Sequence, residues 1–372
     1  MHVATPAASH TSCRLRLVDR GRTITIPILR SGILARRFCR PGARAELVAV
    51  FERSLYLRCA DMFLCIATPA IGNGPITMIG DFGRFERLSD LGLRPGLPVS
   101  ISDRCITIGG SVRFAFEGCE LWRPSAWPVP RPCVELINIC DAIVRLALVQ
   151  GPDQGFAQGY RLPERGSDEP PLARIARSRI AHFQSWLREA LQTNRIDTAA
   201  CLDAIQGLIG LGPGLTPSGD DFLVGALAVL DALAERNAHA ALADAIAAAL
   251  PSLTCPLSNY LLRAAATGHL GEPLCRAVSA MISGMVEPAV GSIRAIGHSS
   301  GWDMLVGAAS TLKVVAAARS RWPPDEASRT APQLAQLENT TTPAAACRAS
   351  PAGTAPPRGS GYRPARSPPR PG

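Results

Sequence analysis

The side chains best suited to chemistry lie in one short segment, Gly210-Leu-Gly-Pro-Gly-Leu-Thr-Pro-Ser-Gly-Asp-Asp-Phe222. Its three alternating glycines can take positive φ and present free backbone N–H groups. Thr216-Pro217 predicts the start of a helix, with a hydroxyl N-cap followed by proline at the first helical position. A glycine-rich loop that leads into a helix N-terminus is typical of anion-binding sites. The segment therefore predicts a set of substrate-binding residues, namely Gly212, Gly214, Thr216, Ser218 and Gly219.

Two adjacent carboxylates, Asp220 and Asp221, complicate a simple phosphate cradle. They repel a bare anion unless a divalent cation or a hydrogen-bond donor accompanies it. A ligand that carries both an anionic end and an amide NH2 group meets this requirement. The alternative is that both carboxylates only interact with the positive end of the helix dipole. Capping alone leaves the three glycines unexplained, so we assign Asp220 and Asp221 to the catalytic residues.

A second copy of the pattern lies downstream. Ser218-Gly-Asp-Asp-Phe-Leu-Val-Gly-Ala226 and Ser300-Gly-Trp-Asp-Met-Leu-Val-Gly-Ala308 are identical at seven of nine positions. Each copy leads into an apolar helix, so two helix N-termini can converge on one ligand. The second copy adds three substrate-binding residues, Ser299, Ser300 and Asp303, and places His298 as a general acid. A lone histidine beside a glycine is as often structural.

Three segments also resemble a known family. The segment from Gly212 to Leu223 resembles the signature of the AllH-like family, Gly297–Asp303 resembles its second block, and Gly72–Ile76 resembles an N-terminal block. The likeness covers roughly residues 14 to 320. The name-giving member is similar to a subunit of oxamate carbamoyltransferase from anaerobic allantoin breakdown. That enzyme interconverts oxalurate plus phosphate with oxamate plus carbamoyl phosphate.

The resemblance implies a carbamoyltransferase subunit that acts on a small anionic amide of the oxamate or oxalurate type, with other protein subunits as partners. Two alternatives stay open. One is a Mg²⁺-dependent phosphotransferase or hydrolase in which Asp220, Asp221 and Asp303 bind the ion. The other is a non-catalytic ligand-binding or scaffold subunit. The leading interpretation requires no cofactor and no bound metal.

Composition narrows the class of protein. The chain has 372 residues, 47% of them hydrophobic, which is ample for a sizeable core. Its net charge of +9 comes without a basic stripe interleaved with aromatic residues, so nucleic acid binding is not expected. Twelve cysteines include no Cys-x-x-Cys pair, which argues against a zinc or redox site. We find no signal peptide and no membrane span, and we expect a cytoplasmic protein.

The chain is expected to be α+β. A mostly antiparallel β-rich domain at 14–120 follows a disordered N-terminus at 1–13. A linker at 121–132 leads to a helical domain at 133–319, which carries the glycine-rich loop. Eleven prolines among the 53 residues of 320–372 predict a disordered tail.

The expected strands are short apolar runs between turns, at residues 45–51, 54–58, 62–67, 76–79, 99–102, 105–108 and 112–116. The expected helices lie at 133–149, 172–192, 198–209, from 216 onward, 238–250, 256–267, 273–285 and 300–319. Gly225 and Gly307 should permit close contacts between helices. The polar loop at 151–171 is an ordinary connection or a lid. Gly72–Pro75 is expected to form a tight turn, and His269 to follow a helix C-terminus.

Overall fold

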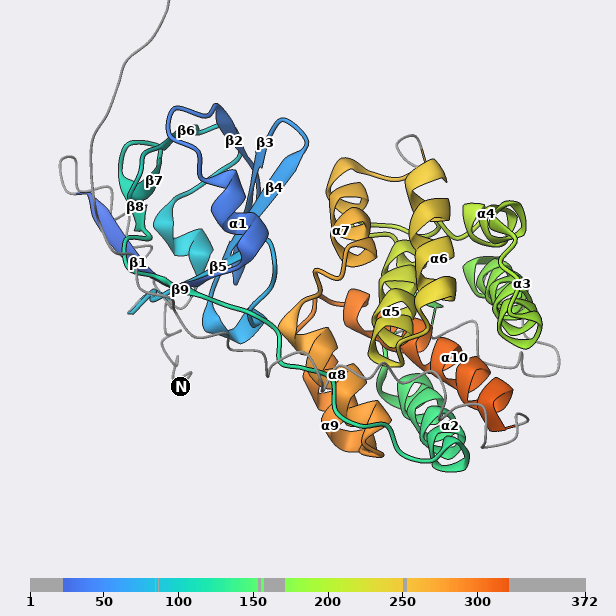
Figure 1. The fold of residues 1–372 in the computed structure, drawn as a ribbon. Helices are drawn as coiled ribbons and strands as arrows, with labels where there is room; N and C mark the ends of the chain where they lie inside the picture. The colour runs from blue at the N-terminus through green and yellow to red at the C-terminus, as the bar shows by residue number, and fades with distance from the viewer. Residues whose placement is uncertain are drawn as a thin grey trace, which may run out of the picture. The chain divides into compact units, whose positions relative to one another are not determined.

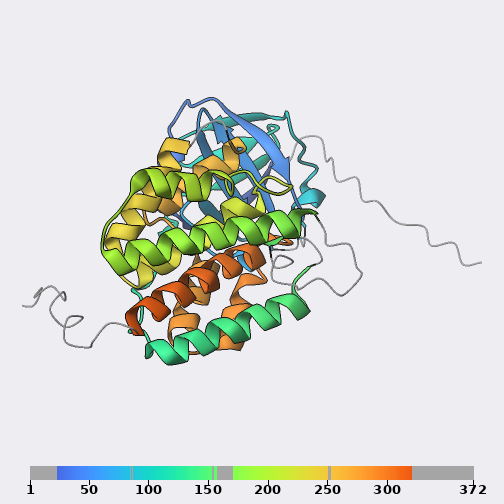
Figure 2. The same ribbon diagram turned by 90° about the vertical axis from the view of Figure 1, so that its right-hand side faces the viewer.

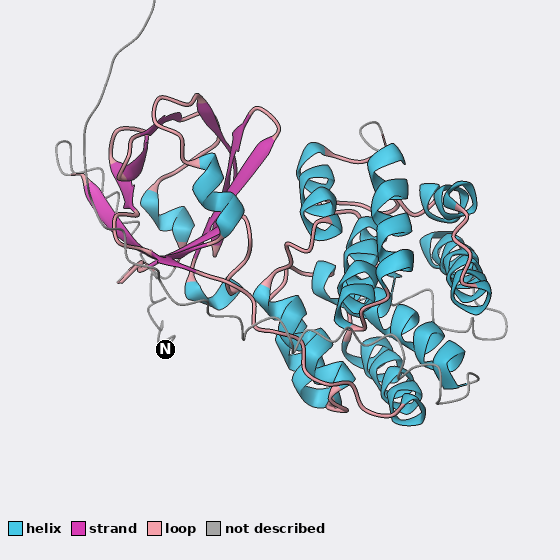
Figure 3. Cartoon of the chain, in the orientation of Figure 1, coloured by secondary structure: helices cyan, strands magenta, loops and turns pink. Residues whose placement is uncertain are grey.

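The computed structural model of the chain describes residues 23–83, 85, 87–152, 155–156, 171–249 and 253–320. A β-rich half comes first in the chain and a helical half follows, as Figures 1 and 3 show. The predicted α+β class is confirmed. The predictions for residues 1–13, for most of the 151–171 loop and for the tail after Ser320 lie outside the described residues. Ser320 itself, assigned above to the tail, is the last residue of a helix.

Strands β1–β8 form a closed barrel, in the order β5-β4-β3-β2-β6-β7-β8-β1 with β1 pairing back to β5. The barrel closes because β1 changes partner along its length. Ile24–Pro27 pairs parallel with β8, and Ile28–Ser31 pairs antiparallel with β5. The described strands are β1 (Ile24–Ser31), β2 (Ala45–Val50), β3 (Ser54–Cys59), β4 (Met62–Ala67), β5 (Thr77–Gly80), β6 (Pro98–Ile101), β7 (Cys105–Ile108), β8 (Val112–Ala115) and β9 (Glu120–Leu121).

All seven predicted strands are present, each within two residues of its expected bounds. Strands β1 and β9 and the short helix α1 (Ile33–Phe38) were not predicted. Pro27 breaks the strand signal of β1, since proline cannot donate to a ladder. In the structure, Pro27 lies where β1 changes partner, and its carbonyl accepts a hydrogen bond from Asp81 N at 2.8 Å.

Alternation along β3 sends neighbouring side chains to opposite faces of the barrel wall. Leu55 and Leu57 point into the barrel core, together with Phe38 from α1. Tyr56 lies between them in sequence and instead packs in a cluster that includes Leu257 of the helical half. The wall of the barrel therefore contributes side chains to two separate cores.

The helical half surrounds a central helix, α5. The described helices are α2 (Cys133–Gln150), α3 (Pro171–Thr193), α4 (Thr198–Gln206), α5 (Ser218–Ala232), α6 (Arg236–Ala249), α7 (Pro256–Ala266), α8 (Glu272–Ile282), α9 (Val286–Ile293) and α10 (Ser300–Ser320). Figure 2 shows α10 lying between α2 and α3, with which it packs. Every residue of α5 from Ser218 to Leu230 is buried. None of the helices in the described ranges combines the length and the apolar character needed to cross a bilayer.

The sequence predicted a helix for each of α2 to α8 and for α10, but missed α9 as well as α1. Helix α4 ends at Gln206 rather than Ile209, because Gly207 follows as its C-cap. Helix α8 ends at Ile282, three residues early, since Gly284 takes a positive φ of 84°. That turn separates α8 from α9, a helix for which the sequence analysis made no prediction.

Helices α5 and α10 approach each other at backbone-to-backbone distance. A Cβ atom on Gly225 would overlap the carbonyl oxygen of Met304, and a Cβ on Gly307 would overlap that of Phe222. Gly225 matches Gly307 in the internal repeat, and Phe222 matches Met304. The two copies therefore contact each other reciprocally, and the predicted close approach at both glycines is confirmed.

The turn at Gly72–Pro75 joins the barrel to α8. Glu272 accepts hydrogen bonds from the backbone N–H of Asn73 at 3.0 Å and from its side-chain amide, and Glu272 N donates to Asn73 O at 2.8 Å. Gly72 has a positive φ of 81° and faces Pro273. The predicted tight turn is therefore also a contact between the two halves of the chain.

We expect Gly225→Ala and Gly307→Ala each to lower the free energy of unfolding by ~1–3 kcal/mol or more, because the added methyl group would overlap a carbonyl oxygen. The control is Gly291→Ala in α9, where a Cβ would meet no atom. This control should raise stability by ~0.4–1 kcal/mol, since alanine is the better helix former. Urea denaturation of the three variants measures both effects. Equal stabilities for all three would show that the α5–α10 contact is looser than described.

Candidate functional site

The N-termini of α5 and α10 meet and exchange hydrogen bonds. The Ser300 hydroxyl of α10 bonds the Asp221 carboxyl of α5, and the Ser218 hydroxyl of α5 bonds the Asp303 carboxyl of α10. Thr216 Oγ1 lies 2.8 Å from Ser300 Oγ. Ser218 matches Ser300 in the repeat and Asp221 matches Asp303, so this exchange is reciprocal. The structure thus brings the two Ser-Gly-x-Asp copies to one place.

Asp303 is buried, with 1% of its surface exposed, and only one of its oxygens is occupied. Oδ1 accepts a hydrogen bond from Phe156 N at 2.6 Å, whereas Oδ2 has no partner within the described chain. A Cβ on Gly155 would crowd this carboxyl. Burial raises the pKa of Asp303 to about 6, against the lowering effect of the bonds from Phe156 and Ser218.

Asp221 is 2% exposed, and its Oδ2 also lacks a partner in the described part of the chain. Burial raises the pKa of Asp221 well above its usual value, and the nearby charges of Asp303 and Asp220 raise it further. Hydrogen bonds from Ser300 and Thr216 act in the opposite direction. Both shifts favour the protonated form of a carboxyl, and the two groups titrate as a coupled pair.

Asp220 differs from its neighbour because protein donors occupy both of its oxygens. Oδ1 accepts from Gly210 N at 2.8 Å, and Oδ2 accepts from the hydroxyls of Thr254 and Ser258. The carboxylate thereby ties the glycine-rich loop to the start of α7. Its contacts are those of a residue that shapes the loop, and no free oxygen is left to face a ligand.

The glycine-rich loop has the backbone conformation expected from its sequence. Gly210, Gly212 and Gly214 take positive φ values of 75°, 115° and 102°. The N–H groups of Gly212, Gly214 and Thr216 meet no acceptor among the described residues. Gly219 packs against the backbone of Leu208, where a Cβ would overlap a carbonyl oxygen. Free donors therefore lie immediately before α5, as an anion site requires.

The predicted helix start was wrong by one residue. Helix α5 begins at Ser218 with Pro217 as its N-cap, and no side chain caps it. The hydroxyl of Thr216 lies within hydrogen-bond distance of Ser300 instead. A contact across the repeat has replaced the local cap, and the sequence around Thr216 could not reveal this partner.

Tyr56 of the barrel comes close to Asp221 and was not predicted. The pKa of Tyr56 is raised well above its usual value by the Cys65 side chain, by burial, and also by the charge of Asp221. The Tyr56 hydroxyl shares hydrogen bonds with Cys65 and Ser54. Tyr56 lies near Asp221 only because the barrel packs on the helical half. No local sequence signal therefore identifies this contact.

His298 and Ser299 lie in the turn before α10. His298 is exposed, and within the described residues it makes no hydrogen bond or ion pair with the carboxyl pair. Ser299 contributes its backbone, because Ser299 O accepts from Asp303 N at 3.0 Å. The assignment of His298 as a general acid thus gains no support from its surroundings.

The arrangement offers little to a metal ion. Among the described residues, no group of three or more His, Cys, Asp or Glu side chains is placed to hold one. The Mg²⁺ alternative needs Asp220, Asp221 and Asp303 together, and Asp220 is already saturated by protein donors. The carboxyl pair is better suited to hydrogen bonds with an amide.

Comparison with known proteins identifies two matching family models. The model described as oxamate carbamoyltransferase subunit AllH matches residues 208–312, and that of the AllH family N-terminal domain matches residues 29–121. Together the two spans cover more than half of the chain and include both Ser-Gly-x-Asp copies and the Gly72–Pro75 turn. No solved structure matches the chain.

We expect Asp303→Asn to change how stability depends on pH. The folded-state pKa of about 6 lies above the ordinary value of 3.8, so the folded chain binds this proton more tightly than the unfolded chain. Stability therefore falls as the pH rises from about 4 to about 6. The asparagine variant lacks this ionisation, and should gain up to ~3 kcal/mol over the parent chain at pH 8 relative to pH 4.

Urea denaturation of both proteins at pH 4 and pH 8 measures this difference. The matched control is Asp244→Asn, which replaces an exposed aspartate on α6. It should shift stability equally at both pH values. A parallel shift for Asp303→Asn as well would contradict the raised pKa of its carboxyl.

Proposed function

This chain belongs to the AllH family, and we propose from this that it is a subunit of a carbamoyltransferase that acts on a small anionic amide of the oxamate or oxalurate type. The substrates in one direction are oxalurate and phosphate, and the products are oxamate and carbamoyl phosphate. The family description contains the word subunit, which supports a complex with other proteins. The same proposal places the activity in the cytoplasm and in the breakdown of allantoin.

The observation that carries the proposal is the pair of unpartnered oxygens, Oδ2 of Asp221 and Oδ2 of Asp303. A buried polar atom without a partner is costly, so such atoms indicate a ligand that supplies the missing bonds. A protonated carboxyl offers a donor, and a carboxylate offers an acceptor. A carbamoyl group needs that combination, because its oxygen accepts and its NH2 donates.

In this proposal Asp303 accepts a hydrogen bond from the carbamoyl NH2 group, and Asp221 donates to the carbamoyl oxygen. Negative charge develops on that oxygen when a phosphate oxygen attacks the carbamoyl carbon, so the Asp221 proton stabilises the tetrahedral intermediate. The bond from carbon to the oxamate nitrogen then breaks. The proton of the attacking hydrogen phosphate ends on that nitrogen, which leaves as the oxamate amide.

The free N–H groups before α5 provide for the anionic end of the substrates. Gly212, Gly214 and Thr216 present donors without a protein acceptor in the described chain, beside the positive end of the α5 dipole. We assign phosphate or the substrate carboxylate to this loop. Asp220 holds the loop in place through Gly210 and α7, so its role is positioning.

Substitution of the two carboxyls should lower kcat/KM to different extents. The assay measures the formation of carbamoyl phosphate from oxalurate and phosphate. Asp303→Asn turns an acceptor into a donor that faces the substrate NH2, and should lower kcat/KM by about 100-fold. Asp221→Asn keeps a donor toward the carbamoyl oxygen, and should lower kcat/KM by only about tenfold. Asp244→Asn is the control and should leave the rate unchanged.

The assay is run with and without co-purified partner proteins, and with and without EDTA. Activity that appears only with partners still requires intact Asp303 under the proposal. Loss of activity with EDTA would favour the Mg²⁺ alternative, and an Asp303→Asn complex with full activity would favour a scaffold. Equal losses in the Asp221 and Asp303 variants would contradict the assigned roles.

A further inference from the structure

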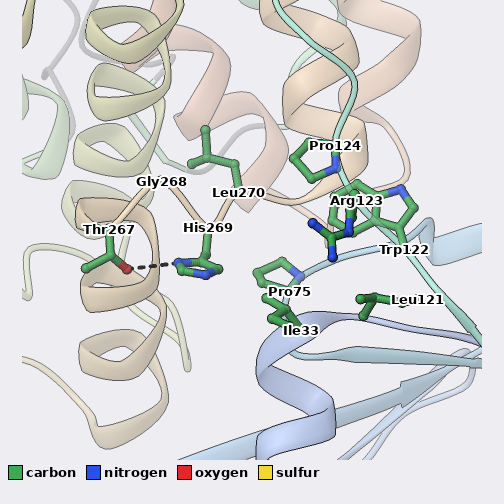
Figure 4. Close-up of a pocket in the computed structure, with 10 residues that line it drawn as sticks. All are labelled: Ile33, Pro75, Leu121, Trp122, Arg123, Pro124, Thr267, Gly268, His269 and Leu270. Carbon is green, nitrogen blue, oxygen red and sulfur yellow. Dashed lines mark hydrogen bonds between the residues drawn. The ribbon is translucent and has the colours of Figure 1, made fainter. Parts of the chain in front are cut away.

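A cavity of about 400 Å³ lies between the barrel and the loop from α7 to α8 (Figure 4). It shares no residue with the carboxyl pair at α5 and α10. One wall comes from the β-rich half and from the segment that follows β9, and the other comes from residues 267–270. The lining residues are Ile33, Pro75, Leu121, Trp122, Arg123, Pro124, Thr267, Gly268, His269 and Leu270.

Arg123 is the one charged side chain that lines this cavity. It makes no ion pair or hydrogen bond with any described residue. The backbone next to it is held on the Trp122 side, where Trp122 N donates to Ser31 O at 3.0 Å. Figure 4 shows its guanidinium extending toward the wall that carries His269. A guanidinium without a carboxylate partner among the described residues is suited to bind an anion.

His269 is held in place from two directions. Its backbone ends α7, with His269 N bonded to Ala264 O and Gly268 N bonded to Ala265 O, both at helix-capping positions. Its Nδ1 lies 3.0 Å from the Thr267 hydroxyl, which also contacts the carbonyls of Arg263 and Ala264. When the Thr267 hydroxyl donates to Nδ1, the ring proton is on Nε2, and Nε2–H can donate to a ligand.

Most of the remaining lining is apolar. Pro75 and Pro124 lie on the barrel side, together with the indole of Trp122, and Leu270 lies on the helical side. No Asp or Glu lines the cavity, so nothing there competes for the Arg123 guanidinium. A volume of this size holds one small molecule. The lining therefore combines an apolar space with one cation and one imidazole nitrogen.

We propose that this cavity is a second ligand site, which binds a carboxylate carried on a flat or apolar body. Arg123 pairs with the two carboxylate oxygens, Nε2–H of His269 donates to one of them, and the body rests against Trp122 and the two prolines. The site is separate from the reaction site of the carbamoyltransferase proposal and does not depend on it. A ligand here contacts both halves of the chain, next to the Asn73–Glu272 contact.

Benzoate is the probe, because it is a flat carboxylate with an apolar ring, and benzamide is its uncharged counterpart of the same shape. Isothermal titration on the full chain should give a Kd of about 1 mM or tighter for benzoate. Benzamide should bind at least about tenfold more weakly, since it lacks the charge that pairs with Arg123.

Two variants and one control locate the binding. Arg123→Gln should weaken benzoate binding by about tenfold or more, and His269→Ala by a smaller factor. Arg113→Gln removes an exposed arginine of β8 that does not line the cavity, and should leave the benzoate Kd unchanged. Phosphate affinity should survive Arg123→Gln, because the proposed function places the anionic groups of the substrates at the loop before α5. That result separates the two sites.

Three results would overturn the second site. They are benzoate and benzamide binding alike, benzoate affinity unaffected by Arg123→Gln, and no benzoate heat at millimolar concentration. A normal melting temperature for Arg123→Gln checks that a loss of binding does not reflect unfolding. Loss of phosphate affinity together with benzoate affinity would mean that both ligands use the cavity, and would contradict the separation of the sites.

Discussion

The backbone contact between α5 and α10 is the constraint on which the site depends. Gly225 and Gly307 let the two helices approach until carbonyl oxygens occupy the space of the missing side chains. At that distance Ser218 and Ser300 each reach the carboxyl of the other helix. Larger residues at either glycine would separate the helices, and with them the two carboxyls. The chemistry at the helix ends is therefore set by packing more than a turn away.

Two buried acids so close together oppose folding unless a proton or a ligand relieves them. Burial raises the pKa of both Asp221 and Asp303. The negative charge of Asp303 raises the pKa of Asp221 further. Burial of the apolar side chains of α5 and α10 stabilises the fold enough to offset this unfavourable interaction. A ligand that donates hydrogen bonds to the two carboxyls would reduce the repulsion between them. The interaction that destabilises the empty site therefore also favours binding of such a ligand.

The sequence predicted those features that local pattern or repetition encodes. Seven strands, the class of the fold and the convergence of the two Ser-Gly-x-Asp copies followed from alternation, glycine placement and the internal match. The different contacts of Asp220 and Asp221 were not predictable, because Asp220 accepts from Thr254 and Ser258, which lie at the start of α7. The approach of Tyr56 likewise depends on how the barrel docks. Such contacts arise from tertiary packing and leave no local signal.

The two copies of the repeat share their Ser, Gly and second Asp positions but differ at the position of Asp220. Asp220 of the first copy is replaced by Trp302 in the second, so only the first copy anchors a glycine-rich loop. Trp302 instead packs beside Gly151 at the end of α2. A molecule bound between the two carboxyls would therefore meet the loop that Asp220 anchors on the α5 side and Trp302 at the matching position on the α10 side. The repeat thus supplies two matched carboxyls, and the single difference between Asp220 and Trp302 makes the two ends of the site unequal.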